Sequence, residues 1–120
     1  MKTKIIVLDT DNLNMIVEAL EDLYGDKAEI KKLYDAIDFE KEEIVDLYFI
    51  QATFINRGII SLKEIVDKNK NSKIVAISAM ESFLEEAKRI PLVTSVFNKL
   101  VIIDDRRDKN ETLRLLNLLN

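Results

Sequence analysis

Three short apolar runs constrain the fold of this chain more than any other sequence feature. They span Ile5–Leu8, Ile74–Ile77 and Leu100–Ile103, and every position in them is apolar. A strand that is apolar on both faces has to be covered on both sides, as the central strands of a parallel sheet are. A fourth run, Val45–Ile50, also favours a strand, with a helix as the alternative. These runs predict parallel strands buried between two layers of helices.

Helical periodicity appears between and after these strands. Apolar residues recur at spacings of three and four residues in several segments, and Gly25 and Pro91 stand beyond the ends of two of them. The segments are Leu13–Leu23, Ile59–Val66, Phe83–Ala87 and residues 109–119. Alternating strands and helices indicate an α/β protein. We expect a three-layer α/β/α sandwich around a parallel sheet of about five strands.

The stretch "AEIKKLYDAI" (residues 28–37) is ambiguous. Ile30, Leu33 and Ile37 fit one face of a helix, whereas Lys31 and Lys32 interrupt the alternation that a half-buried strand would show. The local pattern therefore favours a helix, and a strand is the alternative.

The composition excludes several classes of function. The 120 residues are the length of one domain, and we expect a single domain over residues 1–120. The chain has no Cys and no His, which excludes disulfides, thiolate metal sites and His-based catalysis. A net charge of −4 argues against a nucleic-acid partner, because no surplus of cations is available to neutralise phosphates.

Localisation follows from the lengths of the apolar runs. None approaches the roughly 20 residues that cross a membrane, and the N-terminal run is too short for a signal peptide. We expect a cytoplasmic protein that makes no contact with membranes. We also expect no cofactor, with Mg²⁺ as an open alternative, because any metal would have to be held by carboxylates.

Acidic and hydroxyl side chains follow three of the predicted strands. "IIVLDTDN" (residues 5–12), "KIVAISA" (73–79) and "KLVIIDD" (99–105) all end in this way. Ligands bind beyond the carboxyl ends of parallel strands, so these side chains are expected to gather at one edge of the sheet. They are Asp9, Asp11, Ser78, Asp104 and Asp105. A divalent cation would relieve their mutual repulsion; the alternative is that they solvate strand ends or cap helices.

Over nearly its whole length the chain resembles the receiver domain of two-component response regulators. "KIIVLDTDNLNMIVEALEDLYG" is similar to the first strand, acidic turn and first helix of a receiver. "VDLYFIQATFINRGIISLKEIVDKNKNSKIVAISAM" is similar to the third strand through the fourth. The resemblance implies a flavodoxin-like, receiver-like fold, in which residues 28–34 would form a strand.

The resemblance also implies a phosphorylation pocket that is degenerate in this chain. A working receiver holds Mg²⁺ on two acids of the first turn and accepts phosphate on an Asp after the third strand. A hydroxyl follows the fourth strand and a Lys the fifth. Gln51 falls at the phosphoacceptor position, and a carboxamide cannot act as the nucleophile that forms an acyl phosphate. The corresponding pocket residues are Asp9, Thr10, Asp11, Gln51, Ser78 and Lys99.

Lys99 is matched to the lysine of a receiver pocket only by its position along the chain. If Leu100–Ile103 is the fifth strand, Lys99 precedes it and Asp104 stands at its carboxyl end instead. In that arrangement Asp9, Asp11 and Asp104 are the candidate Mg²⁺ ligands.

A second resemblance is to haloacid-dehalogenase-type phosphohydrolases. "LDTDN" is similar to their first motif, which implies Asp9 as nucleophile and Asp11 as general acid/base. "VAIS" and "LVIIDD" are similar to motifs that hold the phosphoryl group and Mg²⁺. Too few residues separate Ser78 from Asp104 for the strand and helix that such enzymes place there. A helix at residues 28–37 would suit a small cap in these enzymes.

We therefore expect an atypical receiver that signals by protein–protein contact without conventional phosphorylation and is not an enzyme. A small Mg²⁺-dependent phosphohydrolase is the alternative. One face of the last predicted helix cannot bury all of its leucines, so the remainder are expected to contact a signalling partner or a second copy of the chain. The candidate interface residues are Leu115, Leu118 and Leu119. No further domain is expected, so any output would pass through that partner.

Overall fold

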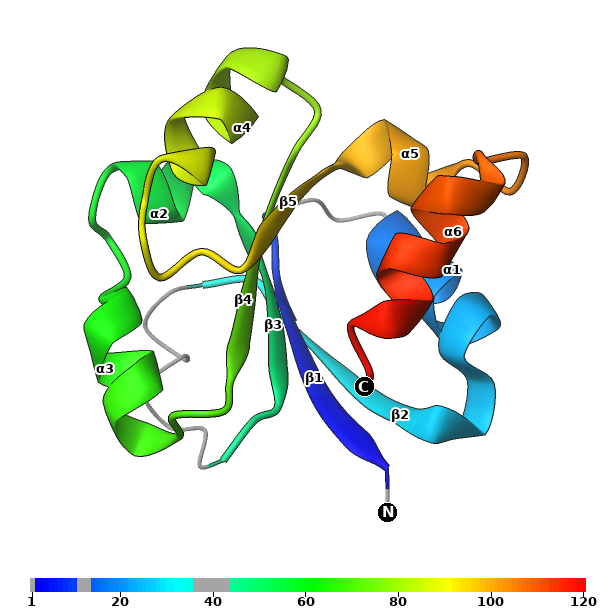
Figure 1. The fold of residues 1–120 in the computed structure, drawn as a ribbon, viewed down its shortest axis with the longest axis horizontal. Coiled ribbons are helices and arrows are strands. Elements are labelled where there is room, and N and C mark those ends of the chain that lie inside the picture. The colour runs from blue at the N-terminus through cyan, green and yellow to red at the C-terminus, as the bar shows by residue number, and fades with distance from the viewer. Residues whose placement is uncertain (1, 11–13, 36–43) are drawn as a thin grey trace.

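The computed structural model describes residues 2–10, 14–35 and 44–120. These residues form five strands, and helices follow β1, β3, β4 and β5 (Figure 1). The strands are β1 (Thr3–Leu8), β2 (Ala28–Leu33), β3 (Leu47–Gln51), β4 (Lys73–Ser78) and β5 (Ser95–Asn98). The helices are α1 (Met15–Tyr24), a 3-10 turn η1 (Gly25–Lys27), α2 (Ala52–Asn56), α3 (Leu62–Lys68), α4 (Glu81–Lys88), α5 (Lys99–Ile103) and α6 (Lys109–Asn117).

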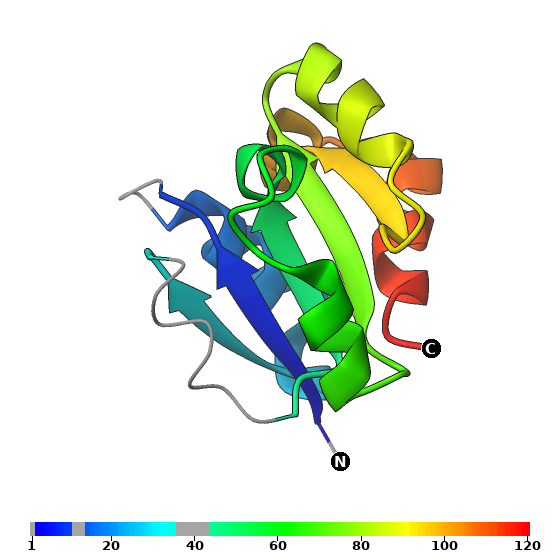
Figure 2. The ribbon, with the colours of Figure 1, turned by 90° about the vertical axis from the view of Figure 1, so that its left-hand side faces the viewer.

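The five strands form one parallel sheet in the order β2-β1-β3-β4-β5. Helices α1, α5 and α6 cover one face, and α2, α3 and α4 cover the other (Figure 1). The predicted three-layer sandwich with a five-stranded parallel sheet is confirmed. Because the strands run in one direction, their carboxyl ends share one edge of the sheet (Figure 2).

The central strands send alternate side chains into two separate cores. In β1, Ile5 and Val7 pack toward α1, α5 and α6, whereas Ile6 and Leu8 pack toward the opposite layer of helices. All four are at most 2% exposed. Burial on both faces explains why these four consecutive positions are all apolar, since any unpaired polar side chain there would lose its hydration.

The prediction of a helix at residues 28–37 is wrong over the part that the structure describes. Residues 28–33 form β2, an edge strand that pairs in register with β1 from Thr3↔Ala28 to Leu8↔Leu33. Glu29 and Lys31 are exposed, because only one side of an edge strand is paired and such a strand tolerates charge. Ile37 lies outside the described residues.

The prediction of a strand at Leu100–Ile103 is also wrong, because this run lies in helix α5. The fifth strand is the preceding segment Ser95–Asn98, which pairs with β4. Asn98 ends that strand and begins the helix, since its side-chain Oδ1 accepts a hydrogen bond from the Leu100 N–H at 2.8 Å. Only Ile102 of the apolar run is fully buried, while Leu100 is 59% exposed.

The other predicted elements are present with shifted ends. The run Val45–Ile50 contains most of β3, so its interpretation as a strand is confirmed. The four periodic segments correspond to α1, α3, α4 and α6, although Leu13 lies outside the described residues. The short helix α2 has no predicted counterpart, because five residues are too few to show a period. Among the described residues, no helix is long and apolar enough to span a bilayer.

Candidate functional site

The carboxyl edge of the sheet collects the polar residues that follow the central strands. Asp9 follows β1, Gln51 ends β3, Ser78 ends β4, and Lys99 follows β5. These strands are neighbours, with Gln51 opposite Ile77 and Ser78 opposite Asn98. Of the acidic and hydroxyl residues that the strand pattern predicted at this edge, Asp9 and Ser78 lie there.

A buried ion pair forms the centre of this edge. The Lys99 Nζ lies 2.7 Å from Oδ2 of Asp9, and the side chains are 19% and 2% exposed, respectively. The Asp9 N–H donates to the carbonyl of Leu33 at 3.2 Å, so the end of β2 helps to hold this residue. A buried carboxylate requires a counter-charge, because its hydration has been removed. Lys99 supplies that charge from the first turn of α5.

The helical structure of α5 is what brings Lys99 into the pocket. Had Leu100–Ile103 been the fifth strand, Lys99 would have stood at the amino edge of the sheet. Because β5 ends at Asn98, Lys99 lies at the carboxyl edge beside Asp9. Lys99 therefore lies at the carboxyl edge, where the order of residues along the chain had placed it, and Asp104 follows a helix instead of a strand.

Gln51 and Thr10 form the second contact of the pocket. The Thr10 hydroxyl donates to Oε1 of Gln51 at 3.1 Å, and the Thr10 N–H approaches the same oxygen at 3.4 Å. The carboxamide oxygen thus joins the end of β3 to the residue that follows Asp9. The Gln51 carboxamide carries no charge, and its oxygen accepts these hydrogen bonds.

Ser78 is placed as predicted, but its hydroxyl oxygen is used locally. Ser78 is 6% exposed, and its Oγ accepts a hydrogen bond from the Met80 N–H at 3.0 Å. Next to it, the Asn98 amide donates to Oε1 of Glu81 at 2.8 Å, which ties β5 to the start of α4. Sequence reasoning missed Asn98; an Asn directly before an apolar helical turn is the signal that could have identified it.

Two predicted acids are not brought to this edge. Asp104 follows α5, about 7.5 Å along the helix axis from Lys99 at a rise of 1.5 Å per residue, and its Oδ1 accepts a hydrogen bond from the Arg106 N–H at 2.9 Å. Asp105 lines a surface groove beside Asp22 and Leu23 of α1. The prediction that Asp104 and Asp105 follow a strand is wrong. Asp11 lies outside the described residues, and within those residues no three acidic side chains are placed to share a metal ion.

The predicted interface leucines belong mostly to the core. Leu115 is completely buried, and its carbonyl accepts a hydrogen bond from the buried Tyr24 hydroxyl at 2.6 Å. Leu118 and Leu119 are half-buried and pack against the same core cluster. Leu115 is therefore unavailable to a partner, which corrects this part of the prediction.

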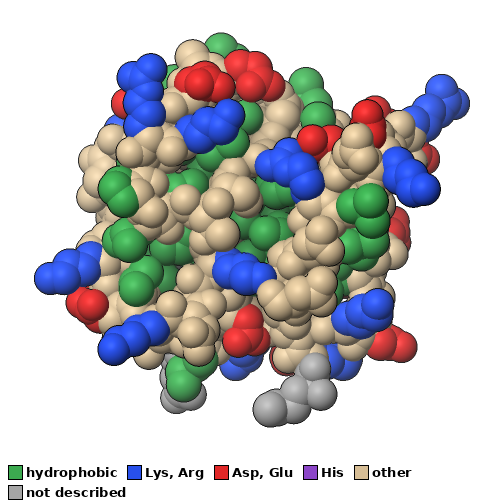
Figure 3. Space-filling model, in the orientation of Figure 1, with side chains coloured by type: hydrophobic (Ala, Val, Ile, Leu, Met, Phe, Trp, Pro, Cys, Tyr) green, Lys and Arg blue, Asp and Glu red, His purple; other side chains and the backbone are tan. Residues whose placement is uncertain are grey.

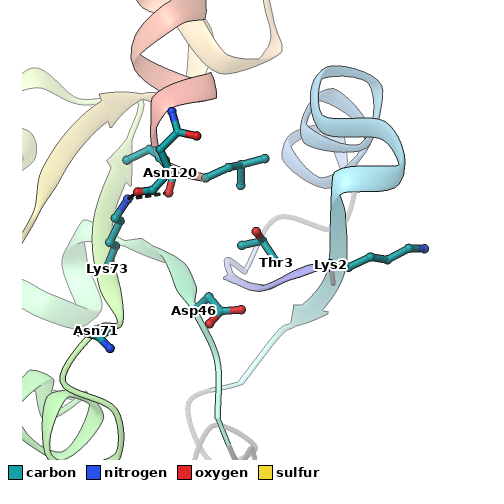
Figure 4. Close-up of a pocket in the computed structure, with 8 residues that line it drawn as sticks. Lys2, Thr3, Asp46, Asn71, Lys73 and Asn120 are labelled. Atoms are coloured by element: carbon teal, nitrogen blue, oxygen red, sulfur yellow. Dashed lines mark hydrogen bonds between the residues drawn. The ribbon is translucent and has the colours of Figure 1, made fainter.

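The amino edge of the sheet carries a separate cavity of about 350 Å³ (Figure 4). Its lining includes Thr3, Asp46 and Lys73, together with the half-buried Leu118 and Leu119. The Lys73 ammonium group donates to the carbonyls of Leu118, at 2.9 Å, and of Asn120, at 2.6 Å. Lys73 thus holds the segment after α6 against the first residue of β4.

Comparisons with known proteins agree with this architecture. No family model and no curated protein matches the chain, but solved structures do. A response regulator from Thermotoga maritima matches at a TM-score of 0.70 and 14% identity, over 99% of this chain and 98% of its own. A response regulator from Colwellia psychrerythraea matches at a TM-score of 0.67 and 17% identity, over 100% of this chain and 98% of its own. The BeF3-activated DrrB receiver domain matches at a TM-score of 0.67 and 12% identity, over 99% of this chain and 98% of its own.

The chain has the fold of a response-regulator receiver domain. The predicted resemblance to receivers is confirmed at the level of the fold, including the strand at residues 28–33 that the resemblance implied. In this receiver fold, Asp9, Gln51, Ser78 and Lys99 occupy the edge at which ligands of open parallel sheets bind.

Proposed function

We propose that this protein is an atypical receiver-like signalling domain that acts without phosphorylation of the usual position. The proposal is carried by Gln51, which ends β3 where a receiver presents its phosphoacceptor carboxylate. A carboxamide oxygen is too weak a nucleophile to form an acyl phosphate. The contact of Gln51 with Thr10 gives this side chain a structural use in its place.

The proposed output is contact with a signalling protein, and the domain is proposed not to be an enzyme. A haloacid-dehalogenase-type phosphohydrolase is the alternative, in which the buried Asp9 would attack the phosphoryl group. Two features argue against it: Lys99 occupies one oxygen of Asp9, and Asp104 and Asp105 follow a helix. The alternative nevertheless makes a distinct prediction, because its nucleophile is Asp9 and a receiver's is the residue at position 51.

Treatment with an acyl phosphate donor and Mg²⁺ tests this proposal. We expect the intact mass of the wild-type protein to stay unchanged, because Gln51 cannot accept a phosphoryl group and Asp9 is paired with Lys99. A phosphorylatable receiver in the same mixture checks that the donor is active. A phosphoryl adduct that disappears in Asp9→Asn would establish the phosphohydrolase-type alternative. An adduct that survives in Asp9→Asn would place phosphorylation elsewhere and also contradict the proposal.

We further propose that the surface over α4, β5 and α5 pairs two copies of the chain. It exposes Leu92 and Leu100 at 41% and 59% and borders a groove of about 360 Å³ between α4 and α6. The charged residues lining this groove have both signs, which suits a two-fold contact in which each patch meets its own copy. They are Glu81, Lys88, Glu111 and Arg114. The space-filling view likewise shows cationic and anionic side chains interspersed with apolar ones (Figure 3).

Sedimentation equilibrium over a wide concentration range checks the pairing. The weight-average mass is expected to rise from 13.9 kDa toward twice that value with concentration. Leu100→Glu is expected to remain at the monomer mass, because it places a charge in the apolar contact. Lys63→Glu, on the exposed surface of α3, is the matched control and should associate as the wild type does. A wild-type mass that is independent of concentration would remove the homodimer and leave contact with a different protein.

A further inference from the structure

The receiver fold implies a divalent cation at the carboxyl edge, and the described side chains of this pocket do not fit one. Mg²⁺ requires near-octahedral oxygen ligands at 2.0–2.1 Å. One Asp9 oxygen is taken by the Lys99 ammonium group, and the Gln51 carbonyl oxygen accepts from Thr10. A divalent cation bound to Asp9 would also lie beside the positive charge of Lys99, which repels it.

We propose that the Lys99 ammonium group is the resident cation of this pocket and takes the place of Mg²⁺. Asp9 is 1% exposed, so its carboxylate depends on a neighbouring positive charge, and the ammonium group lies 2.7 Å from Oδ2. One positive charge balances one negative charge, and the pair is neutral without any metal. The pocket therefore holds its charge balance at all Mg²⁺ concentrations.

The position of Lys99 is held by its surroundings. The Asn98 side chain fixes the first turn of α5 through the Leu100 N–H, and Ile102 anchors the same short helix in the core. The Lys99 side chain is itself largely buried, at 19% exposed. A pre-positioned ammonium group forms the pair at little conformational cost, since few rotamers remain to be lost.

This inference deepens the proposed function and rests on it, because a pocket that takes neither a phosphoryl group nor Mg²⁺ leaves protein contact as the input to the domain. The two can still fail separately. Urea unfolding with MgCl₂ involves no phosphoryl donor, so a wild-type response to Mg²⁺ would overturn the inference alone. A phosphoryl adduct at a residue other than Asp9, in a wild-type protein that shows no response to Mg²⁺, would overturn the proposed function alone.

Urea unfolding of four proteins, with and without 10 mM MgCl₂ at matched ionic strength, tests the inference. The proteins are wild type, Lys99→Met, Asp9→Asn and the double variant. We expect Lys99→Met to be the least stable, and to recover when Mg²⁺ replaces the missing charge. If Mg²⁺ reaches ten times its Kd, the folding equilibrium constant of Lys99→Met rises by about tenfold. Wild type and the double variant are expected not to respond, because one keeps the ammonium group and the other lacks the carboxylate.

Backbone amide NMR gives a readout that stability alone does not. During a Mg²⁺ titration of Lys99→Met, saturable shifts are expected at Thr10, Gln51 and Ser78, and none in the double variant. A wild-type protein that shows the same shifts, or the same gain in stability, overturns the inference. A Lys99→Met protein that is indifferent to Mg²⁺ overturns it as well. Should Lys99→Met fail to fold, Lys99→Gln takes its place, and the wild-type titration still decides.

Discussion

Replacement of Leu115 by alanine is expected to lower the free energy of unfolding by about 2–5 kcal/mol, the usual cost of emptying a buried leucine site. Leu115 is completely buried and packs with Leu20 of α1 and Phe97 of β5 in one core cluster. The loss should be independent of protein concentration, because the side chain stabilises the monomer. Urea denaturation at two protein concentrations that differ a hundredfold measures both the size of the loss and its concentration dependence.

Leu113→Ala is the matched control, because Leu113 lies in the same helix but is 45% exposed. Its free energy of unfolding should change by no more than about 0.5 kcal/mol. A Leu115→Ala protein that keeps wild-type stability, but loses its capacity to self-associate, would show that the leucine serves an interface. That outcome would support the interface role that the sequence pattern predicts for Leu115 and would contradict its position in the core.

Alkaline pH is expected to destabilise the protein through Tyr24. Burial raises the pKa of the Tyr24 hydroxyl above its ordinary value of 10.0, and the nearby Arg107 guanidinium opposes this rise only in part. The folded protein therefore retains a proton that the unfolded chain releases above pH 10. The contribution of the protonated Tyr24 to the free energy of unfolding is fully present below pH 10. Above it, the free energy of unfolding falls by up to about 1.4 kcal/mol per pH unit, until the hydroxyl ionises in the folded state too.

Tyr24→Phe separates this effect from other alkaline transitions. At neutral pH the variant should lose about 1 kcal/mol, because the hydrogen bond to the Leu115 carbonyl is removed. Above pH 10 the loss of stability with pH should be shallower than in the wild type, since every other titrating group is shared. Thermal unfolding of both proteins between pH 7 and 11 provides the comparison. Parallel pH profiles would mean that Tyr24 does not keep its proton in the folded state.

The central strands show how far sequence pattern alone reaches. β1 and β4 are buried on both faces and hydrogen-bonded on both sides, so each contains four consecutive apolar positions and the pattern identifies them. The edge strands β2 and β5 are paired on one side and partly exposed. Their sequences are mixed, and a helical pattern matched β2 better. Edge strands owe their structure to pairing with a neighbour, which local sequence does not encode.

The pocket residues likewise differ in whether the sequence alone could place them. Asp9, Gln51 and Ser78 lie at the carboxyl ends of strands that could be recognised, so their convergence could be predicted from the rule that parallel strands end at one edge. Lys99 and Asp104 flank a run that the pattern assigned to a strand. Once β5 forms at Ser95–Asn98, the run becomes α5, Lys99 reaches Asp9, and Asp104 is carried away from the edge.

The sequence by itself determined the α/β class, the parallel central strands and the carboxamide at the end of the third strand. Only the tertiary structure decided which residues form the edge strands, which cation neutralises Asp9 and which leucines are buried. The physical reason is that an apolar run of four residues suits a strand or a helix about equally well. Its structure depends on which backbone groups lie beside it, and those groups come from distant parts of the chain.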